Sequence, residues 1–424
     1  MIILLIAVFV ICLFLRFPIA FAIGVSCLVY IVIKGIPLVI LPLKMYSGID
    51  VFVLLSIPGF ILAGNLMNHG GITEKIIEFC NHLFGHVRGG LSLANIGASM
   101  LFAGISGTAV SDTASIGSVM IPAMEKEGYK ADYACAVTAA SSTVGPIIPP
   151  SVPMIIAATL TGLSVGKLFL AGALPGLLLG VGFLFVAYVL SKNQPHKKKK
   201  RSSFLEVLWG FFDTFWALLM TFIILFGIIG GVFTPTEASI VAVVYAACIG
   251  LFVYRKLTLK AIPRILLESF KTSASLMILV GFSNLLGWIL VTEGLPEMIS
   301  ETLLGVTANK FVILIFINLI LLVVGTFMET IAALLIMFPV LLNVAVGVGV
   351  DPIQFGVIAV LNLIIGLTTP PVGVCLFVAS SIGKISIDKV SRAILPFLVV
   401  SILVLLLVTY IPQISLFLPG LFYK

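Results

Sequence analysis

The stretch GISGTAVSDTASIGSVMIP, residues 104–122, places serines, threonines, glycines and one aspartate between long apolar segments. In a lipid bilayer, backbone N–H and C=O groups must find partners inside the protein. Irregular backbone is therefore tolerated only where protein or a water-filled cavity surrounds it. The stretch predicts a hairpin whose tip, near residues 104–114, is buried in the protein at membrane depth.

The composition places the chain in a membrane. Of its 424 residues, 61% are hydrophobic and 10% charged, and the mean hydropathy is +1.27. A soluble domain is about half apolar and a quarter charged. The apolar runs are continuous and do not alternate with polar residues, which excludes a transmembrane β-barrel. We expect an all-α integral membrane protein of about ten crossing helices and two re-entrant hairpins.

The two halves of the chain share motifs in the same order. GTAVSDTASIGSVMIP (107–122) corresponds to GTFMETIAALLIMFP (325–339), and Pro149-Pro150 corresponds to Pro370-Pro371. Such repeats indicate one structural unit used twice, so a second hairpin tip is expected near residues 325–331. The predicted divisions are a first repeat over 1–191 with a broken helix at 130–161, a basic linker over 192–203, and a second repeat over 204–424 with a broken helix at 352–382.

Basic residues predict the orientation of the chain. The run HKKKKR (196–201) is typical of a cytoplasmic loop, and Arg255, Lys256, Lys260 and Arg264 return to the same side after two crossings. The first hairpin then enters from the cytoplasm and the second from the opposite side, which inverts the two repeats. Three more polar stretches, 72–88, 258–271 and 295–306, are expected to be amphipathic helices along the membrane surface.

Each half also carries a proline-rich break, TVGPIIPPSVP (143–153) and IGLTTPPVG (365–373). Proline removes a backbone donor and glycine permits a positive φ, so both segments should unwind and free carbonyl oxygens. Unwound carbonyls and half-helix ends coordinate sodium in secondary transporters. We predict one sodium site in each half, formed by Ser106, Thr108, Gly145 and Pro149 in the first and by Gly325, Thr326, Met328, Gly366 and Thr369 in the second.

Polar side chains near these segments are candidates for binding a solute. Asp112 and Glu329 are acids in apolar surroundings, where a functional role is the default, although each could instead cap a half-helix. Ser141, Ser142 and Thr143 could line a cavity or bond back to their own helix. Asn362 completes the substrate-binding prediction, but it also belongs to a set expected to form interhelical hydrogen bonds: Asn65, Asn95, Asn284, Asn318 and Asn362.

Together these features resemble the large membrane subunit of TRAP (tripartite ATP-independent periplasmic) transporters. The resemblance covers essentially the whole chain and is most specific at SGTAVSDTASIGSVMIPAM, GPIIPPSVPMI and GLTTPPVGVCLF. It implies an elevator-type fold in the bacterial inner membrane and sodium-coupled import of an organic acid, with sialic acid favoured and C4-dicarboxylates next. It also implies two partners, a small four-helix membrane subunit and a periplasmic substrate-binding protein. The stretches 72–88 and 295–306 would be arm helices between a scaffold and a moving domain.

A channel is the main alternative, because re-entrant hairpins also build pores. The inverted repeats favour alternating access around a central site instead. A serine protease built on Gly104-Ile-Ser106-Gly107 would need a nearby base, and the four histidines lie outside the expected spans. No P-loop motif is present. We therefore expect no catalytic residue, organic cofactor or transition-metal site, and Na⁺ as the co-transported ion.

The topology predicts that a cysteine introduced as Ser202→Cys lies in the cytoplasm. A membrane-impermeant thiol reagent applied to intact cells should leave it unlabelled, and the same reagent should label it after the membrane is permeabilised. Labelling from outside intact cells would reverse the predicted orientation of both hairpins.

Overall fold

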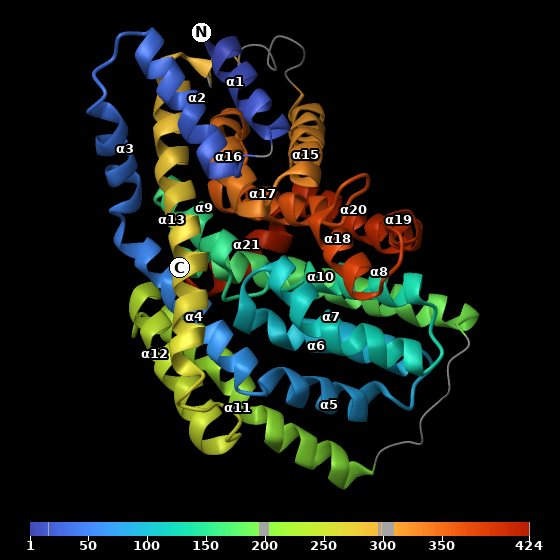
Figure 1. The fold of residues 1–424 in the computed structure, drawn as a ribbon. Coiled ribbons are helices and arrows are strands. Elements are labelled where there is room, and N and C mark those ends of the chain that lie inside the picture. The colour runs from blue at the N-terminus through green and yellow to red at the C-terminus, as the bar shows by residue number, and fades with distance from the viewer. Residues whose placement is uncertain (16, 195–202, 296–297, 299–308, 424) are drawn as a thin grey trace.

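In the computed structural model, the described residues are 1–15, 17–194, 203–295, 298 and 309–423, and all their regular structure is helical (Figure 1). The side chains of residues 103–106, 193 and 204 lie outside this description, as does most of the basic linker. The predicted arm helix at 295–306 also falls almost entirely outside the described residues. The prediction of an all-α protein is confirmed.

One group of helices forms a scaffold around a long central helix, which runs the height of the molecule in Figure 1. This helix, α13, packs against α2, α3 and α4, while α4 packs against α12. The scaffold helices are α1 (Ile2–Phe14), α2 (Ile19–Ile33), α3 (Ile40–Ile49), α4 (Ser56–His69) with the preceding 3₁₀ turn Phe52–Leu55, α11 (Phe204–Ile229), α12 (Pro235–Cys248) with the following π-helix Ile249–Val253, and α13 (Ile262–Thr292).

The expectation of a separate surface helix at 258–271 is wrong, because α13 runs without interruption from residue 262 to 292. No glycine or proline interrupts the segment between Pro263 and Gly281. Its hydroxyl groups also bond back within the helix, for example from Thr272 to the Glu268 carbonyl at 3.1 Å and from Ser273 to the Ser269 carbonyl at 2.8 Å. The polar residues therefore satisfy themselves without ending the helix.

The two hairpins and the two broken helices form at the predicted positions. Residues 143–151 separate α8 from α9, and residues 367–373 separate α17 from α18, with proline-rich sequence at both breaks. The elements are α6 (Gly90–Ser106) and α7 (Ala109–Lys126), α8 (Ala131–Ser142) and α9 (Val152–Thr161), α15 (Lys310–Phe327) and α16 (Thr330–Gly347), and α17 (Pro352–Gly366) and α18 (Val374–Ile382).

Each hairpin packs against parts of both broken helices. The hairpin α6/α7 packs on α8 and on α18, whereas the hairpin α15/α16 packs on α17 and on α9. Each hairpin therefore contacts the first half of one broken helix and the second half of the other. We call this unit the hairpin body; it also contains α10 (Val165–Leu190), α19 (Ile387–Ala393), α20 (Leu395–Tyr410) and α21 (Pro412–Phe422).

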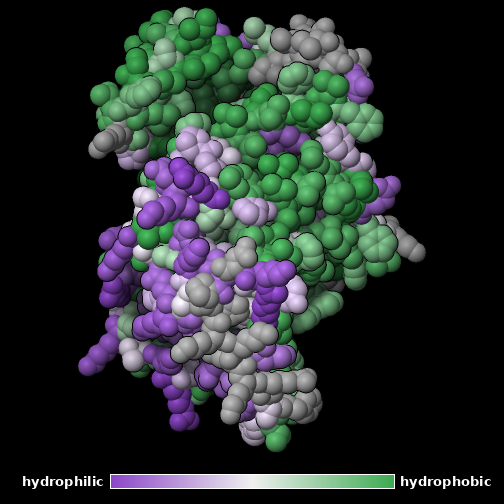
Figure 2. Space-filling model, turned by 90° about the vertical axis from the view of Figure 1, so that its right-hand side faces the viewer, coloured by the Kyte–Doolittle hydropathy of each residue, from purple (hydrophilic) through white to green (hydrophobic). Residues whose placement is uncertain are grey.

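Among the described residues, seven helices are long and apolar enough to cross a membrane, or eight if the bent pair α19 and α20 forms one span. The total of ten crossings also depends on α1 and α2, which are shorter, and on the broken helices, so it stays a prediction. The sequence did not predict α3 or α21 as helices. Figure 2 shows an apolar upper part and a hydrophilic lower part on one face of the molecule.

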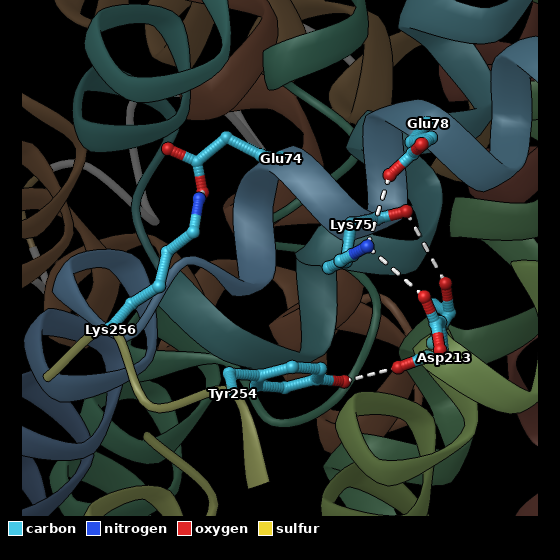
Figure 3. Close-up of polar contacts among 7 residues, drawn as sticks. Glu74, Lys75, Glu78, Asp213, Tyr254 and Lys256 are labelled. Atoms are coloured by element: carbon cyan, nitrogen blue, oxygen red, sulfur yellow. Dashed lines mark hydrogen bonds and ion pairs between the residues drawn. The ribbon is translucent and has the colours of Figure 1, made fainter. Parts of the chain in front are cut away.

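Helix α5 (Ile72–Phe84) is the predicted arm helix at 72–88, and polar contacts fix it to the scaffold (Figure 3). Lys75 Nζ lies 3.0 Å from Asp213 of α11 and 3.2 Å from Glu78, and Asp213 also accepts a hydrogen bond from Tyr254 through its backbone carbonyl. The hydrogen bond to Asp213 raises the pKa of Lys75, so the ion pair favours the charged ammonium. The N-terminal end of α5 is therefore attached to α11, and α5 also packs on α6, the next helix of the chain.

The packing of the second hairpin predicts the effect of Gly366→Ala. A Cβ atom at residue 366 would lie 2.4 Å from the Gly325 carbonyl carbon, so one backbone must move. Overpacking of this kind costs about 1–3 kcal/mol. The melting temperature of the purified protein should fall, whereas Gly347→Ala, where a Cβ meets nothing within 4 Å, should leave it nearly unchanged. Equal melting temperatures for both variants would contradict the close approach of α15 and α17.

Candidate functional site

The first hairpin tip is a turn of two residues against a broken helix. Gly107 has a φ of +68°, which favours glycine, and Thr108 is extended before α7 begins. A Cβ atom at residue 107 would lie 3.1 Å from Val152 Cγ2, at the start of α9. The tip therefore ends inside the protein, at the break between α8 and α9, as the sequence predicts.

Asp112 connects this hairpin to the break. It lies in the first turn of α7, is fully buried, and does not occupy the N-cap, which is Thr108. A Cβ atom at residue 145 would lie 2.1 Å from Asp112 Oδ2, so only glycine leaves room for the carboxylate there. The structure thus brings Asp112 and Gly145 together. From the sequence, Asp112 is predicted to bind the solute and Gly145 to bind sodium.

The second tip makes corresponding contacts with the other break. Gly325 and Gly366 touch through their backbones, and the Gly373 N–H donates to the Thr326 carbonyl at 3.2 Å. Met328 is extended at the turn, and Glu329 follows as the N-cap of α16. The Glu329 carboxylate accepts hydrogen bonds from the Ile331 and Ala332 N–H groups at 2.9 and 3.4 Å. The sequence allowed either a helix cap or a functional role for each acid. Glu329 is a helix cap, whereas Asp112 does not occupy the cap position.

Several carbonyl oxygens at the tips and breaks lack helical partners. In the ranges that the structure describes, no hydrogen bond reaches the carbonyl oxygens of Gly145, Pro149, Gly325, Met328 or Thr369. These five residues are among those predicted to bind sodium. The Ser106 side chain lies outside the described residues, and the Thr369 hydroxyl donates to the Ile365 carbonyl at 2.9 Å. Gly145, Pro149 and Gly325 are buried, and Met328 and Thr369 are half-buried. The free backbone oxygens at the breaks suit a hard cation.

Both hairpins reach the start of α18. This half-helix packs on α7 of the first hairpin, and the Gly373 N–H directly before it donates to the Thr326 carbonyl of the second tip. Cys375, near the start of α18, is fully buried. The second half of the second broken helix is therefore enclosed by both hairpins.

The hydroxyls before the first break bond back to their own helix. Ser142 donates to the Thr138 carbonyl at 2.7 Å and Thr143 to the Ala140 carbonyl at 2.6 Å. Ser141 bonds to the Thr138 carbonyl at 3.1 Å and accepts from Ser99 at 2.8 Å. All three predicted residues are buried. Each of the three hydroxyl groups already donates its proton to a backbone carbonyl, so it would bind a solute as a hydrogen-bond acceptor.

The asparagine side chains confirm the prediction of interhelical hydrogen bonds. Asn362, on α17, donates to the carbonyl and side-chain oxygens of Asn318 on α15, at 3.0 and 2.9 Å. The Asn362 side-chain oxygen is buried and has no partner in the described part of the chain. The other pairs are Asn65 with Ser269, Asn95 with Thr138, Asn284 with Lys44, and Asn318 with Thr409.

A cavity of about 160 Å³ lies between the first tip and the scaffold. Thr108 and Ser111 of the hairpin line it, opposite Asn65, Asn68 and Thr272 of the scaffold. Beside it, Asn68 donates to Ser115 of α7 at 3.0 Å. Sequence analysis missed Ser111, Asn68 and Thr272. In the sequence these three residues appear only as polar positions on otherwise apolar helices. The sequence alone does not show that the helix faces carrying them lie against each other.

Displacing Asp112 tests its link to the break. The variant Gly145→Ala should push the Asp112 carboxylate aside and reduce solute uptake in proteoliposomes by about tenfold or more, as should Asp112→Asn. The control Gly420→Ala, where a Cβ meets nothing within 4 Å, should transport normally. Full uptake by both test variants, at equal protein levels, would remove Asp112 from the site.

Known proteins are similar to the chain over most of its length. Residues 6–414 match the family described as the tripartite ATP-independent periplasmic transporter, DctM component. The chain is 43% identical over 379 residues to the sialic acid TRAP transporter large permease protein SiaM of Vibrio cholerae, covering 89% of each chain. It is 40% identical over 380 residues to the C4-dicarboxylate TRAP transporter large permease protein DctM of Pseudomonas aeruginosa, covering 90% of this chain and 89% of that protein.

A solved structure of the YdaH transporter from Alcanivorax borkumensis has a similar fold. The TM-score is 0.59 at 13% sequence identity, over 90% of this chain and 88% of that one. At this identity the likeness concerns the fold alone. The family match covers nearly the whole chain, and the two large permeases are 43% and 40% identical to it. The chain therefore belongs to the DctM family of TRAP transporters, as a large permease subunit of the inner membrane and not an enzyme.

Proposed function

We propose that this subunit translocates an organic acid together with sodium ions. Sialic acid is the favoured solute and a C4-dicarboxylate the second candidate. A periplasmic binding protein delivers the solute, and a small membrane subunit of four helices completes the transporter. The relatives named for sialic acid and for C4-dicarboxylates both carry organic acids, which supports this class of solute.

The observation that carries the sodium proposal is the pairing of each hairpin tip with a helix break. Free carbonyl oxygens of Gly145 and Pro149 lie at one break, and those of Gly325, Met328 and Thr369 lie at the other break and its tip. Four helices begin at these same places: α7, α9, α16 and α18. Helix N-termini favour anions and free carbonyls favour cations, so an anionic solute and sodium can be held side by side.

The arrangement of the two bodies supports an elevator mechanism. The scaffold is built around the uninterrupted helix α13, while all interrupted helices belong to the hairpin body. The cavity at the first tip lies between the two bodies, and the Asn68–Ser115 hydrogen bond crosses from one to the other. A hairpin body that slides along the scaffold would carry its tips from one side of the membrane to the other, as alternating access requires.

Uptake by proteoliposomes tests the function. The full transporter, reconstituted with its binding protein, should accumulate labelled sialic acid only when a sodium gradient is imposed. Succinate, a C4-dicarboxylate, should be accumulated instead if the second candidate is the solute. Passive flux of either acid without the binding protein and without sodium would favour a channel.

The variant Thr369→Ala tests the second sodium site. It removes the hydroxyl and loosens the turn that presents the Thr369 carbonyl, because that hydroxyl bonds to the Ile365 carbonyl. The sodium concentration for half-maximal uptake should rise about fivefold or more, with the protein yield unchanged. The matched change Thr258→Ala lies in the loop before α13 and should leave sodium activation as it is. Unchanged sodium activation in Thr369→Ala would argue against this site.

A further inference from the structure

One face of α13 borders two separate cavities between the scaffold and the hairpin body. Thr272 and Leu276 line the cavity beside the first tip, and positions from Val280 to Val291 line a larger cavity. These positions recur every three or four residues, so they form one stripe along the helix. From Leu276 to Trp288 the stripe extends about 18 Å at 1.5 Å per residue.

The larger cavity has a volume of about 470 Å³. Its scaffold wall consists of α3, the segment with the 3₁₀ turn before α4, and α13, and its other wall consists of α9 and α16 of the hairpin body. Polar groups of Ser47, Thr159, Ser283 and Asn284 line it, together with Lys44 and the ring of Trp288. None of the lining residues, all of them in described parts of the chain, is an aspartate or a glutamate. The size and mixed lining are typical of small-molecule sites.

Lys44 supplies a positive charge that has no acidic partner among the described residues. Its ammonium nitrogen lies 5.4 Å from the centre of the Trp288 ring, a cation–π distance. Within the described ranges, no carboxylate lies within ion-pair distance of Lys44. The Asn284 amide donates to the Lys44 carbonyl at 2.7 Å and fixes this turn of α3 against α13. The charge is therefore held in place at the cavity wall and available to an anion.

Ser283 adds an uncommitted polar group to the same wall. Its side chain is 3% exposed, and its hydroxyl has no partner among the described residues. A buried hydroxyl without a partner is costly, and most such groups bind a water molecule or a ligand. Ser283 lies next to Asn284, which lies one turn before Trp288 on α13, and all three residues line the cavity.

We propose that this cavity is a second binding site for the transported organic acid, with Lys44 as the partner of its carboxylate. The site belongs to the scaffold. It rests on the proposed elevator, in which the first hairpin tip moves along the α13 stripe from the smaller cavity towards the larger one. The cavity lies at the C-terminal half of α13, away from the basic segment at 255–264 that predicts the cytoplasmic side. Lys44 would thus meet the acid on the side from which it enters.

Trp288 provides a direct readout, because the chain has only three tryptophans. The other two, Trp209 and Trp216, lie on α11 and are exposed. The variant Trp209→Phe/Trp216→Phe leaves Trp288 as the single fluorophore. The full chain in phosphatidylcholine nanodiscs is titrated with sialic acid, with succinate, and with N-acetylmannosamine, a neutral sugar without a carboxylate. We expect an acid to change the Trp288 emission in a saturable way and the neutral sugar to have no effect.

Variants of the lysine then identify the partner of the carboxylate. In this background, Lys44→Met should raise the half-saturating acid concentration about tenfold or more, the loss of one charge-assisted contact. Lys44→Arg should retain most of the affinity. The matched control Lys310→Met removes a lysine that bonds to the Gly349 carbonyl, away from the cavity, and should leave the titration unchanged.

Three results would overturn the proposal. The first is an emission change that is equal for acid and neutral sugar, or that survives Lys44→Met. The second is a change produced by phosphatidylglycerol in the nanodisc and not by the acids, which would assign the cavity to a lipid headgroup. The third is no change at Trp288 while the same preparation accumulates the acid in proteoliposomes with sodium. That last result would reject the scaffold site and leave the proposed transport function intact.

Discussion

Backbone that leaves helical hydrogen bonding inside a membrane must be enclosed by protein, and the architecture follows from this constraint. The breaks at 143–151 and 367–373 are each closed by a hairpin tip, through Gly107 against Val152 and through Thr326 with Gly373. The glycines at 325 and 366 allow the second tip to approach to backbone contact. At these junctions the carbonyl oxygens of Gly145, Pro149, Gly325, Met328 and Thr369 accept no hydrogen bond from the described residues.

The scaffold and the hairpin body meet this constraint in different ways. The scaffold consists of helices that satisfy their own backbone, including hydroxyls on α13 that bond one turn back. The hairpin body contains all the interrupted segments and encloses them by exchanging the halves of its broken helices. The cavities lie between the bodies, where polar side chains can face each other without exposure to lipid. Relative movement would therefore change which scaffold residues a bound solute meets.

Local sequence chemistry predicted the parts that depend on local backbone. Prolines marked both breaks, glycine followed by threonine marked the tips, and asparagines in apolar helices marked interhelical bonds such as Asn362 with Asn318. Parts that depend on which faces meet were not predictable. Nothing in the sequence indicates that α18 packs on the first hairpin, that Asn68 faces Ser115, or that the polar stretch before residue 272 continues α13. The capping role of Glu329 and the different position of Asp112 likewise required the geometry of the two turns.

The central claim is that each hairpin tip meets a helix break at membrane depth and that their free oxygens hold a cation beside the solute. A density map of the transporter in lipid nanodiscs, recorded with sodium and with sodium replaced by choline, tests it most directly. We predict density for an ion within coordination distance of the Gly145 or Thr369 carbonyl oxygen that is lost in choline. Continuous helices through 143–151 and 367–373, with the tips at Gly107 and Met328 in bulk solvent, would contradict the account.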